Sequence, residues 1–295
     1  MPIFMDVHNV PGVKARDVAE AHYKDLLHQA EHGCKCMTYW IDEDRETIFC
    51  LVEAPAMDAV EQLHSRAHGL IPNKIIEVST SLVQAFLGRI YDPSDARVMD
   101  NGLKVFADPS FRILLFCKLP DRALLRRELG REAADAMLTR AYAAIRSVVD
   151  SHGGREVERE GHHFLASFSI ALKAFEAALA LQVKLKPVLS PAHPLRLSLD
   201  AGEPVQQSGH LFGDTVQNTE DLALIAPAGH VVISASVWEL LAKDHSRIDL
   251  NGALPLSTGD EELVALLFSK LRENWQDVEF DLDNYCRSVA MSKSQ

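Results

Sequence analysis

The alternation of hydrophobic and polar positions in the first eighty residues predicts four strands and two helices. Strand-like runs lie at residues 2–7, 36–41, 47–53 and 74–78, and amphipathic helical runs lie at about 15–31 and 57–67. Their order, βαββαβ, is that of the ferredoxin-like split arrangement. A sheet of this size with two helices has one face half covered, so we expect the N-terminal unit to dimerise through its free face.

Turn-forming residues and a second series of elements follow this unit. A short helix is expected at 82–87, linker chemistry at 91–102, and a buried strand at 111–119 opens a further α+β unit. Acidic residues early and basic residues late in 260–275 predict a helix there, in accord with the helix dipole. We therefore expect a domain at 1–80, a linker at 81–110, a second domain at 111–243 and a C-terminal extension at 244–295.

Composition narrows the partners and the compartment. With 295 residues and 47% hydrophobic content the chain can bury two cores. The formal net charge of -12 disfavours nucleic acid, which requires clustered Lys and Arg. No apolar run resembles a signal peptide or approaches the roughly twenty residues that cross a bilayer. Five cysteines without a repeating framework indicate reduced thiols. The sequence thus predicts a soluble cytoplasmic protein with neither a nucleic-acid nor a membrane partner.

Histidines are concentrated in the first domain. His64 and His68 are spaced i, i+4, so a helix places both rings on one face. Asp6 and His8 point to the same side of the first strand, and Cys50 lies in the middle of another. Imidazole with thiolate suits zinc, copper or nickel rather than magnesium. A buried cysteine is also a common small hydrophobe, so both interpretations of Cys50 stay open.

Five stretches of the first domain resemble a family of small ferredoxin-like bacterial proteins, some of which bind nickel. They are Met5–His8, Ala21–Asp25, Tyr39–Glu43, Phe49–Pro55 and His64–Gly69. The resemblance implies a nickel or zinc site drawn from His22, His64 and His68 first, and then from His8, Cys50 and Glu53. Asn73 stands where that family often has Asp, which would leave the site one carboxylate short.

The second domain resembles the class III adenylate/guanylate cyclases. The motifs that carry the resemblance, in order, are Phe111–Leu119, His152–Val157, Glu160–Phe168, Leu195–Pro204, Leu211–Val216 and Ala226–Ser234. The resemblance implies a second ferredoxin-like unit, hence an α+β chain with two such units. It also implies a nucleotide site formed between two chains, in which two aspartates hold two divalent ions.

The residues that would perform cyclase chemistry are replaced in this chain. Lys118 and His162 stand at the two metal-binding aspartate positions. An ammonium group offers no oxygen ligand to magnesium and repels the ion. Gln217 and Asp221 stand where the family carries Asn and Arg, and an acidic side chain opposes stabilisation of a triphosphate.

Two functions are consistent with this pattern. The first is a non-catalytic regulatory protein in signal transduction, a homodimer whose pseudoenzyme domain mediates dimerisation or binds a nucleotide ligand without turnover. The second is a divergent but active cyclase, a phosphorus–oxygen lyase, that uses magnesium or manganese. It would hold these ions through relocated acids: Glu160, Asp200, Glu203 or Asp214. Within the second hypothesis, the chain could also complement an intact cyclase partner.

Overall fold

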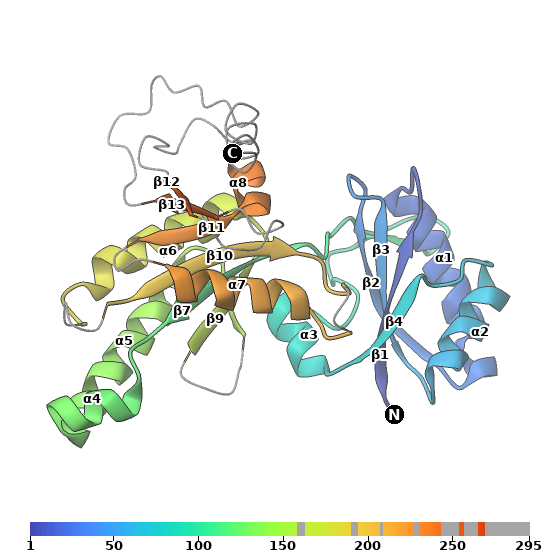
Figure 1. Cartoon of the computed structure of the whole chain (residues 1–295). Helices are drawn as coiled ribbons and strands as arrows, with labels where there is room; N and C mark the ends of the chain where they lie inside the picture. The colour runs from blue at the N-terminus through green and yellow to red at the C-terminus, as the bar shows by residue number, and fades with distance from the viewer. Residues whose placement is uncertain are drawn as a thin grey trace, which may run out of the picture.

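The first domain has the ferredoxin-like fold expected from the sequence. The computed structural model describes residues 1–157, 163–189, 194–206, 209–226, 230–242, 254–256 and 265–268. The elements of the first domain are β1 (Ile3–Asn9), α1 (Ala15–His28), the 3-10 turn η1 (Gln29–His32), β2 (Lys35–Asp42), β3 (Thr47–Glu53), α2 (Met57–Ala67) and β4 (Lys74–Val78). The sheet has the order β2-β3-β1-β4 with every pair antiparallel. Helices α1 and α2 lie together on one face of it (Figure 1).

The second domain contains the same arrangement inside a larger sheet. Its elements are β7 (Arg112–Lys118), α4 (Arg122–Leu129), α5 (Arg131–Ser151), β8 (Arg155–Val157), β9 (His163–Phe168), α6 (Ala171–Leu185), β10 (Arg196–Gly202), α7 (Gly213–Ile225), β11 (Val231–Ser234), α8 (Ala235–Ala242), β12 (Leu254–Leu256) and β13 (Ala265–Phe268). The sheet order is β12-β13-β11-β10-β7-β9-β8. Strands β10-β7-β9-β8 repeat the ferredoxin-like order, and β11 is added parallel to β10 after the crossover helix α7. The prediction of two ferredoxin-like units is confirmed.

One secondary-structure prediction is wrong. Residues 265–268 fall within the helix expected at 260–275, yet they form β13, which pairs antiparallel with β11. The sequence there is Ala-Leu-Leu-Phe, and a short apolar run does not distinguish a helix from a buried strand by its periodicity. Residues 265–268 form a strand because they pair with the open edge of β11. Part of the C-terminal extension expected at 244–295 therefore belongs to the sheet. The other residues of 257–295 lie outside the described part of the chain.

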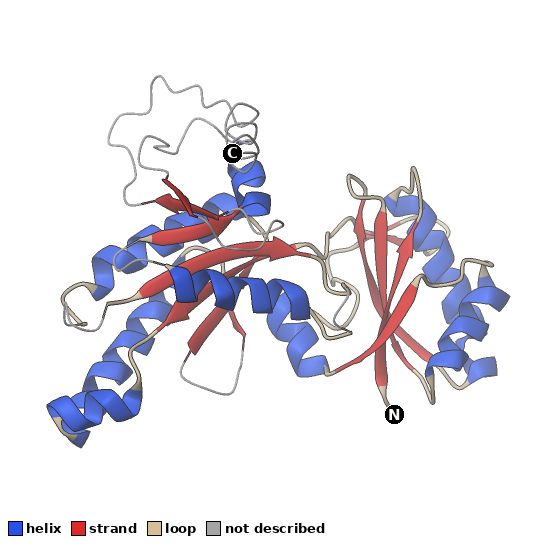
Figure 2. Ribbon diagram, in the orientation of Figure 1, coloured by secondary structure: helices blue, strands red, loops and turns tan. Residues whose placement is uncertain are grey.

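The linker begins with the expected short helix, α3 (Thr80–Leu87), followed by β5 (Arg97–Val98) and β6 (Lys104–Val105). The Ser79 hydroxyl caps α3 by accepting the Leu82 N–H, and Gly88 ends the helix with a φ of 84°. Figure 2 shows α3 between the two sheets. Among the described residues, no helix is both long enough and apolar enough to cross a membrane.

The free face of the first sheet is covered by the rest of the chain. Trp40, Phe49 and Leu51 are fully buried on this face and join one apolar cluster with α3 and the second domain. In that cluster the rings of Phe86 and Phe212 stack with centroids 4.7 Å apart. The expectation that this face mediates dimerisation is therefore wrong, because an intramolecular domain contact already removes it from water.

Candidate metal centre

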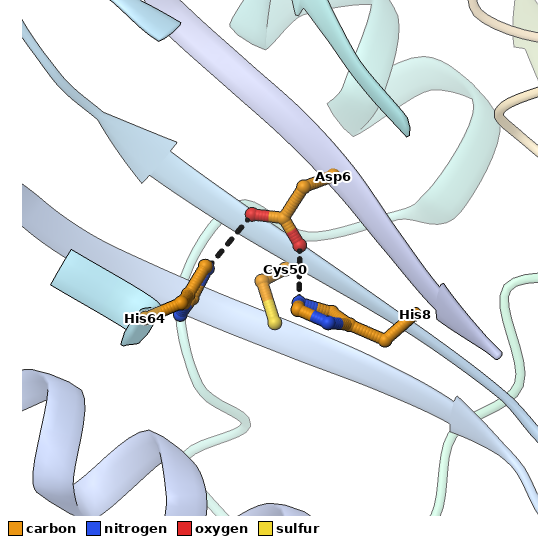
Figure 3. A group of neighbouring side chains, drawn as sticks. All are labelled: Asp6, His8, Cys50 and His64. Carbon is orange, nitrogen blue, oxygen red and sulfur yellow. Dashed lines mark hydrogen bonds and ion pairs between the residues drawn. The ribbon is translucent and has the colours of Figure 1, made fainter. Parts of the chain in front are cut away.

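Two strands of the first domain point polar side chains into the layer between sheet and helices. Asp6 and His8 alternate with buried apolar residues along β1, so both face the helices, and Cys50 lies opposite Asp6 in the register of β1 and β3. The His8 Nε2 atom is 3.1 Å from the Asp6 Oδ1 atom. Figure 3 shows the three side chains converging with His64. They occupy positions that an ordinary ferredoxin-like core fills with aliphatic groups.

The two helices bring the remaining members of the cluster. On α2, His64 lies between two carboxylates: its Nε2 atom is 3.0 Å from Asp6 Oδ2, and its Nδ1 atom is 3.1 Å from Asp25 Oδ1 on α1. One turn later, the His68 Nε2 atom is 3.1 Å from His64 Nδ1 and 3.2 Å from Asp25 Oδ1. The i, i+4 spacing of the histidines thus has the expected result, since both rings reach the same carboxylate.

The cluster is almost completely withdrawn from water. The exposed fraction is 0% for Asp6, 2% for Asp25, 3% for His8 and 1% for His64. Buried polar groups are costly unless they are satisfied. The His8 Nδ1 atom nevertheless has no hydrogen bond. A buried lone pair without a hydrogen-bond donor requires an explanation, and a bound cation supplies one.

Electrostatics within the cluster favour cations. Burial alone would raise the pKa of Asp6, but the charge of His64 and hydrogen bonds to His64 and His8 hold that pKa well below its ordinary value. Burial opposes charge on His64 too, yet Asp6 and Asp25 raise its pKa to about 10. Burial raises the pKa of the Cys50 thiol far above its ordinary value. The site thus stabilises positive charge, and a thiolate ligand would form only as a metal displaces the proton.

The geometry fits a metal ion. Two groups of side chains, Asp6 with His8, Cys50 and His64, and Asp25 with His64 and His68, each present ligand atoms within 4.8 Å of one another. Bonds of about 2.0–2.2 Å to one ion place neighbouring ligands roughly 3–3.5 Å apart, close to the separations seen here. Beside them lies a cavity of about 20 Å³. It is lined by polar His8, His22, Asp25, Cys50 and His68 and by apolar Val18, Ala21, Ile48 and Leu70. Nitrogen, sulfur and carboxylate donors together suit nickel, zinc or copper.

The structure gathers most of the residues expected from the sequence. His8, Cys50, His64 and His68 belong to the two groups, and His22 lines the adjacent cavity. Burial lowers the pKa of His22, which favours the neutral ring that a metal requires.

Glu53 lies apart from this cluster. It follows Cys50 by three positions, an odd offset that turns it to the opposite face of β3, and its carboxylate is 3.8 Å from the N-terminal amine of Met1. Asn73 is also structural, because its Oδ1 atom accepts the Asn9 N–H at 2.7 Å.

Asp25 is a ligand candidate that the sequence does not predict, and the sequence places Asp6 beside His8 on β1 without indicating it as a ligand. Asp25 follows His22 by three residues on α1, so the two share a helix face. That spacing was a usable signal, but nothing in the sequence indicated that this face meets α2.

The altered cyclase positions of the second domain form no comparable site. Lys118 ends β7, opposite Arg196 on β10 and His163 on β9, so three basic residues are neighbours in the sheet at this position. On α7, the Gln217 amide donates to the Asp221 carboxylate at 3.1 Å. His162 lies outside the described residues.

Two of the four acids that could act as relocated ligands, Asp200 and Glu203, make other contacts. Asp200 is buried and accepts a hydrogen bond from the Ser236 hydroxyl at 3.2 Å. Glu203 accepts from Thr47 of the first domain at 3.0 Å. Asp214 lies in the first turn of α7, and Glu160 lies outside the described residues. Within the described ranges, both side-chain groups able to hold an ion belong to the first domain.

Comparisons with known proteins agree with this division. Residues 4–78 match the family model described as "Nickel responsive protein SCO4226-like". A Rhizobium meliloti (strain 1021) protein described as "Putative adenylate cyclase 3" is 28% identical over 120 residues, which are 39% of this chain and 20% of that protein. The chain therefore spans about a fifth of the length of this relative.

Solved cyclase structures are similar to part of this chain. The guanylate cyclase domain of RhGC from Catenaria anguillulae, in complex with GTP, is 17% identical, with a TM-score of 0.44 over 56% of this chain and 98% of that chain. The adenylyl cyclase CyaB from P. aeruginosa is 15% identical, with a TM-score of 0.44 over 57% of this chain and 97% of that chain. One chain thus shows a match to a nickel-responsive family model at residues 4–78 and a partial similarity to an adenylate cyclase.

Proposed function

We propose that this chain is a non-catalytic, metal-responsive regulatory protein. Its first domain binds nickel or zinc, and its cyclase-like domain serves in dimerisation or nucleotide sensing without turnover. The observation that carries the proposal is the buried cluster of Asp6, His8, Cys50 and His64, extended by Asp25 and His68.

The cluster supports metal binding more strongly than a purely structural role. Two carboxylates and several imidazoles in a core cost free energy that aliphatic residues at the same positions would avoid. The His8 Nδ1 atom has no hydrogen bond, and His8 lines a cavity with room for about one water or ion. The family description favours nickel among the metals that this donor set accepts.

The proposed metal function is tested by stoichiometry. Protein purified without a His tag and incubated with nickel should carry about one ion per chain after desalting, because the two groups of ligand atoms share His64. Elemental analysis and titration calorimetry provide the measurement. Occupancy below about 0.2 ions per chain with both nickel and zinc would remove the metal hypothesis.

Loss of catalysis follows from charge at the altered positions. Lys118, with Arg196 and His163 beside it in the sheet, replaces an ion-attracting pocket by a repelling one. The hydrogen bond between Gln217 and Asp221 leaves an acidic pair where phosphate charge would need a cation. The altered pocket supports a binding or dimerisation role in place of turnover.

We expect no cyclic nucleotide from the purified chain with ATP or GTP and an excess of manganese. The physical reason is that two divalent ions have no carboxylate pair at the family positions. Chromatographic detection over hours, with an active class III cyclase as positive control, is the measurement. Product above the enzyme-free blank would instead favour the divergent cyclase.

A further inference from the structure

The linker between the domains is fastened to the first domain at the edge strand β2. The Arg89 guanidinium donates to the Tyr39 carbonyl, the Ile41 N–H donates to the Asp108 carbonyl at 3.1 Å, and the Tyr39 hydroxyl donates to the Lys104 carbonyl at 3.3 Å. The Tyr39 ring also stacks on Phe106 with centroids 4.1 Å apart. These contacts hold the linker along the layer that contains the metal centre.

Asp92 is the linker residue that reaches this layer. Its Oδ1 atom is buried without a hydrogen bond and lies 3.7 Å from the His22 Nε2 atom. Its other carboxylate oxygen is 3.6 Å from Lys104 Nζ, and 13% of its side chain is exposed. His22 in turn lines the cavity with His8, Asp25, Cys50 and His68. Asp92 therefore brings one more carboxylate to the cavity side of His22, and it lies outside residues 4–78, the part of the chain that matches the nickel-responsive family model.

The separation of Asp92 and His22 is informative. A distance of 3.7 Å is too long for a hydrogen bond between nitrogen and oxygen. It is close to the roughly 3–3.5 Å that separates neighbouring ligands of one ion. The unsatisfied oxygen and the imidazole nitrogen thus stand near the positions that a shared cation would give them.

We propose that Asp92 is a further ligand of the ion bound at the His22 side of this cavity, so that metal occupancy fixes the linker. This inference rests on the proposed metal function. The linker continues directly into β7 of the second domain. An ion that binds more tightly when Asp92 is docked must favour the docked linker by the same factor, because the coupling is reciprocal. Metal bound in the first domain would in this way change the position of the linker, and the linker would transmit that change to the cyclase-like domain.

Asp92→Asn in the full chain tests the ligand role. We expect the affinity for nickel to fall about 10-fold, which is the usual loss when one residue that supports a metal site is replaced. Asp95→Asn, an exposed carboxylate in the same linker, is the matched control and should leave the affinity unchanged. Thermal unfolding without metal should differ little between the two variants, since the ion pair that Asp92 makes with Lys104 is half exposed.

Limited trypsin digestion tests the coupling to the linker. Cleavage after the exposed Arg97 should slow when nickel is added to the wild-type chain or to Asp95→Asn, and should not slow for Asp92→Asn. If the wild-type chain binds no nickel, the proposed function fails and this inference fails with it. If the wild-type chain binds nickel but Asp92→Asn matches it in affinity and in protection from trypsin, Asp92 is not a ligand and only this inference is overturned.

Discussion

His64→Ala should weaken nickel binding by at least about 100-fold, because this imidazole belongs to both groups of ligand atoms. The same change should destabilise the metal-free protein by roughly 3–5 kcal/mol, since it leaves Asp6 and Asp25 buried without the cation between them. Calorimetric titration gives the first quantity and urea unfolding gives the second. A variant with wild-type affinity for nickel would show that the ion binds elsewhere.

Because His64→Ala could fail through misfolding alone, Cys50→Ala provides an independent measurement. The Cys50 thiol is buried and its pKa is raised, so it is protonated without metal and its removal should change stability little beyond the lost volume. We expect nickel affinity to fall about 10-fold or more, together with loss of sulfur-to-nickel charge-transfer absorption. Cys117→Ala is the matched control, because it removes another fully buried thiol from the second domain. Equal nickel titrations for the two cysteine variants would exclude Cys50 as a ligand.

Arg112→Ala should lower the free energy of unfolding by roughly 3–5 kcal/mol. The Arg112 guanidinium is buried with 3% exposure and donates to four carbonyls, those of Phe86, Leu87, Pro109 and Phe111. Two of these belong to the C-terminal turn of α3, whose dipole the cation also complements. The substitution would remove the Arg112 donor from all four carbonyls, leaving the Phe86 carbonyl only its bond from the Ser167 hydroxyl, and would weaken the contact of α3 with β7.

Urea unfolding of Arg112→Ala beside Arg127→Ala measures the effect. Arg127 is exposed on α4, so its removal should change stability by less than about 0.5 kcal/mol. Arg112→Lys should fall between the two, because an ammonium keeps the charge but has only three donors. A loss below about 1 kcal/mol for Arg112→Ala would contradict the assignment of Arg112 as the residue that joins helix and strand.

The sequence by itself determined the local helices and strands and which side chains share a face. Period-two and period-3.6 patterns fix which side chains share a face, and this is why the first domain and the shared face of His64 and His68 could be predicted. The expectation that Lys118 and His162 stand at positions where cyclases carry aspartates likewise comes from the sequence alone.

Only the tertiary structure decided which faces meet. Asp25 becomes a candidate ligand because α1 packs beside α2, Glu53 is excluded because its face of β3 lies on the other side, and residues 265–268 become a strand because β11 has an open edge. The same holds for the free face of the first sheet, which the second domain covers, and for Asp92, which a linker brings to His22. These outcomes depend on contacts between segments that are distant in the sequence. Such contacts are set by how whole sheets and helices pack on one another, and the local pattern of hydrophobic residues does not specify that packing.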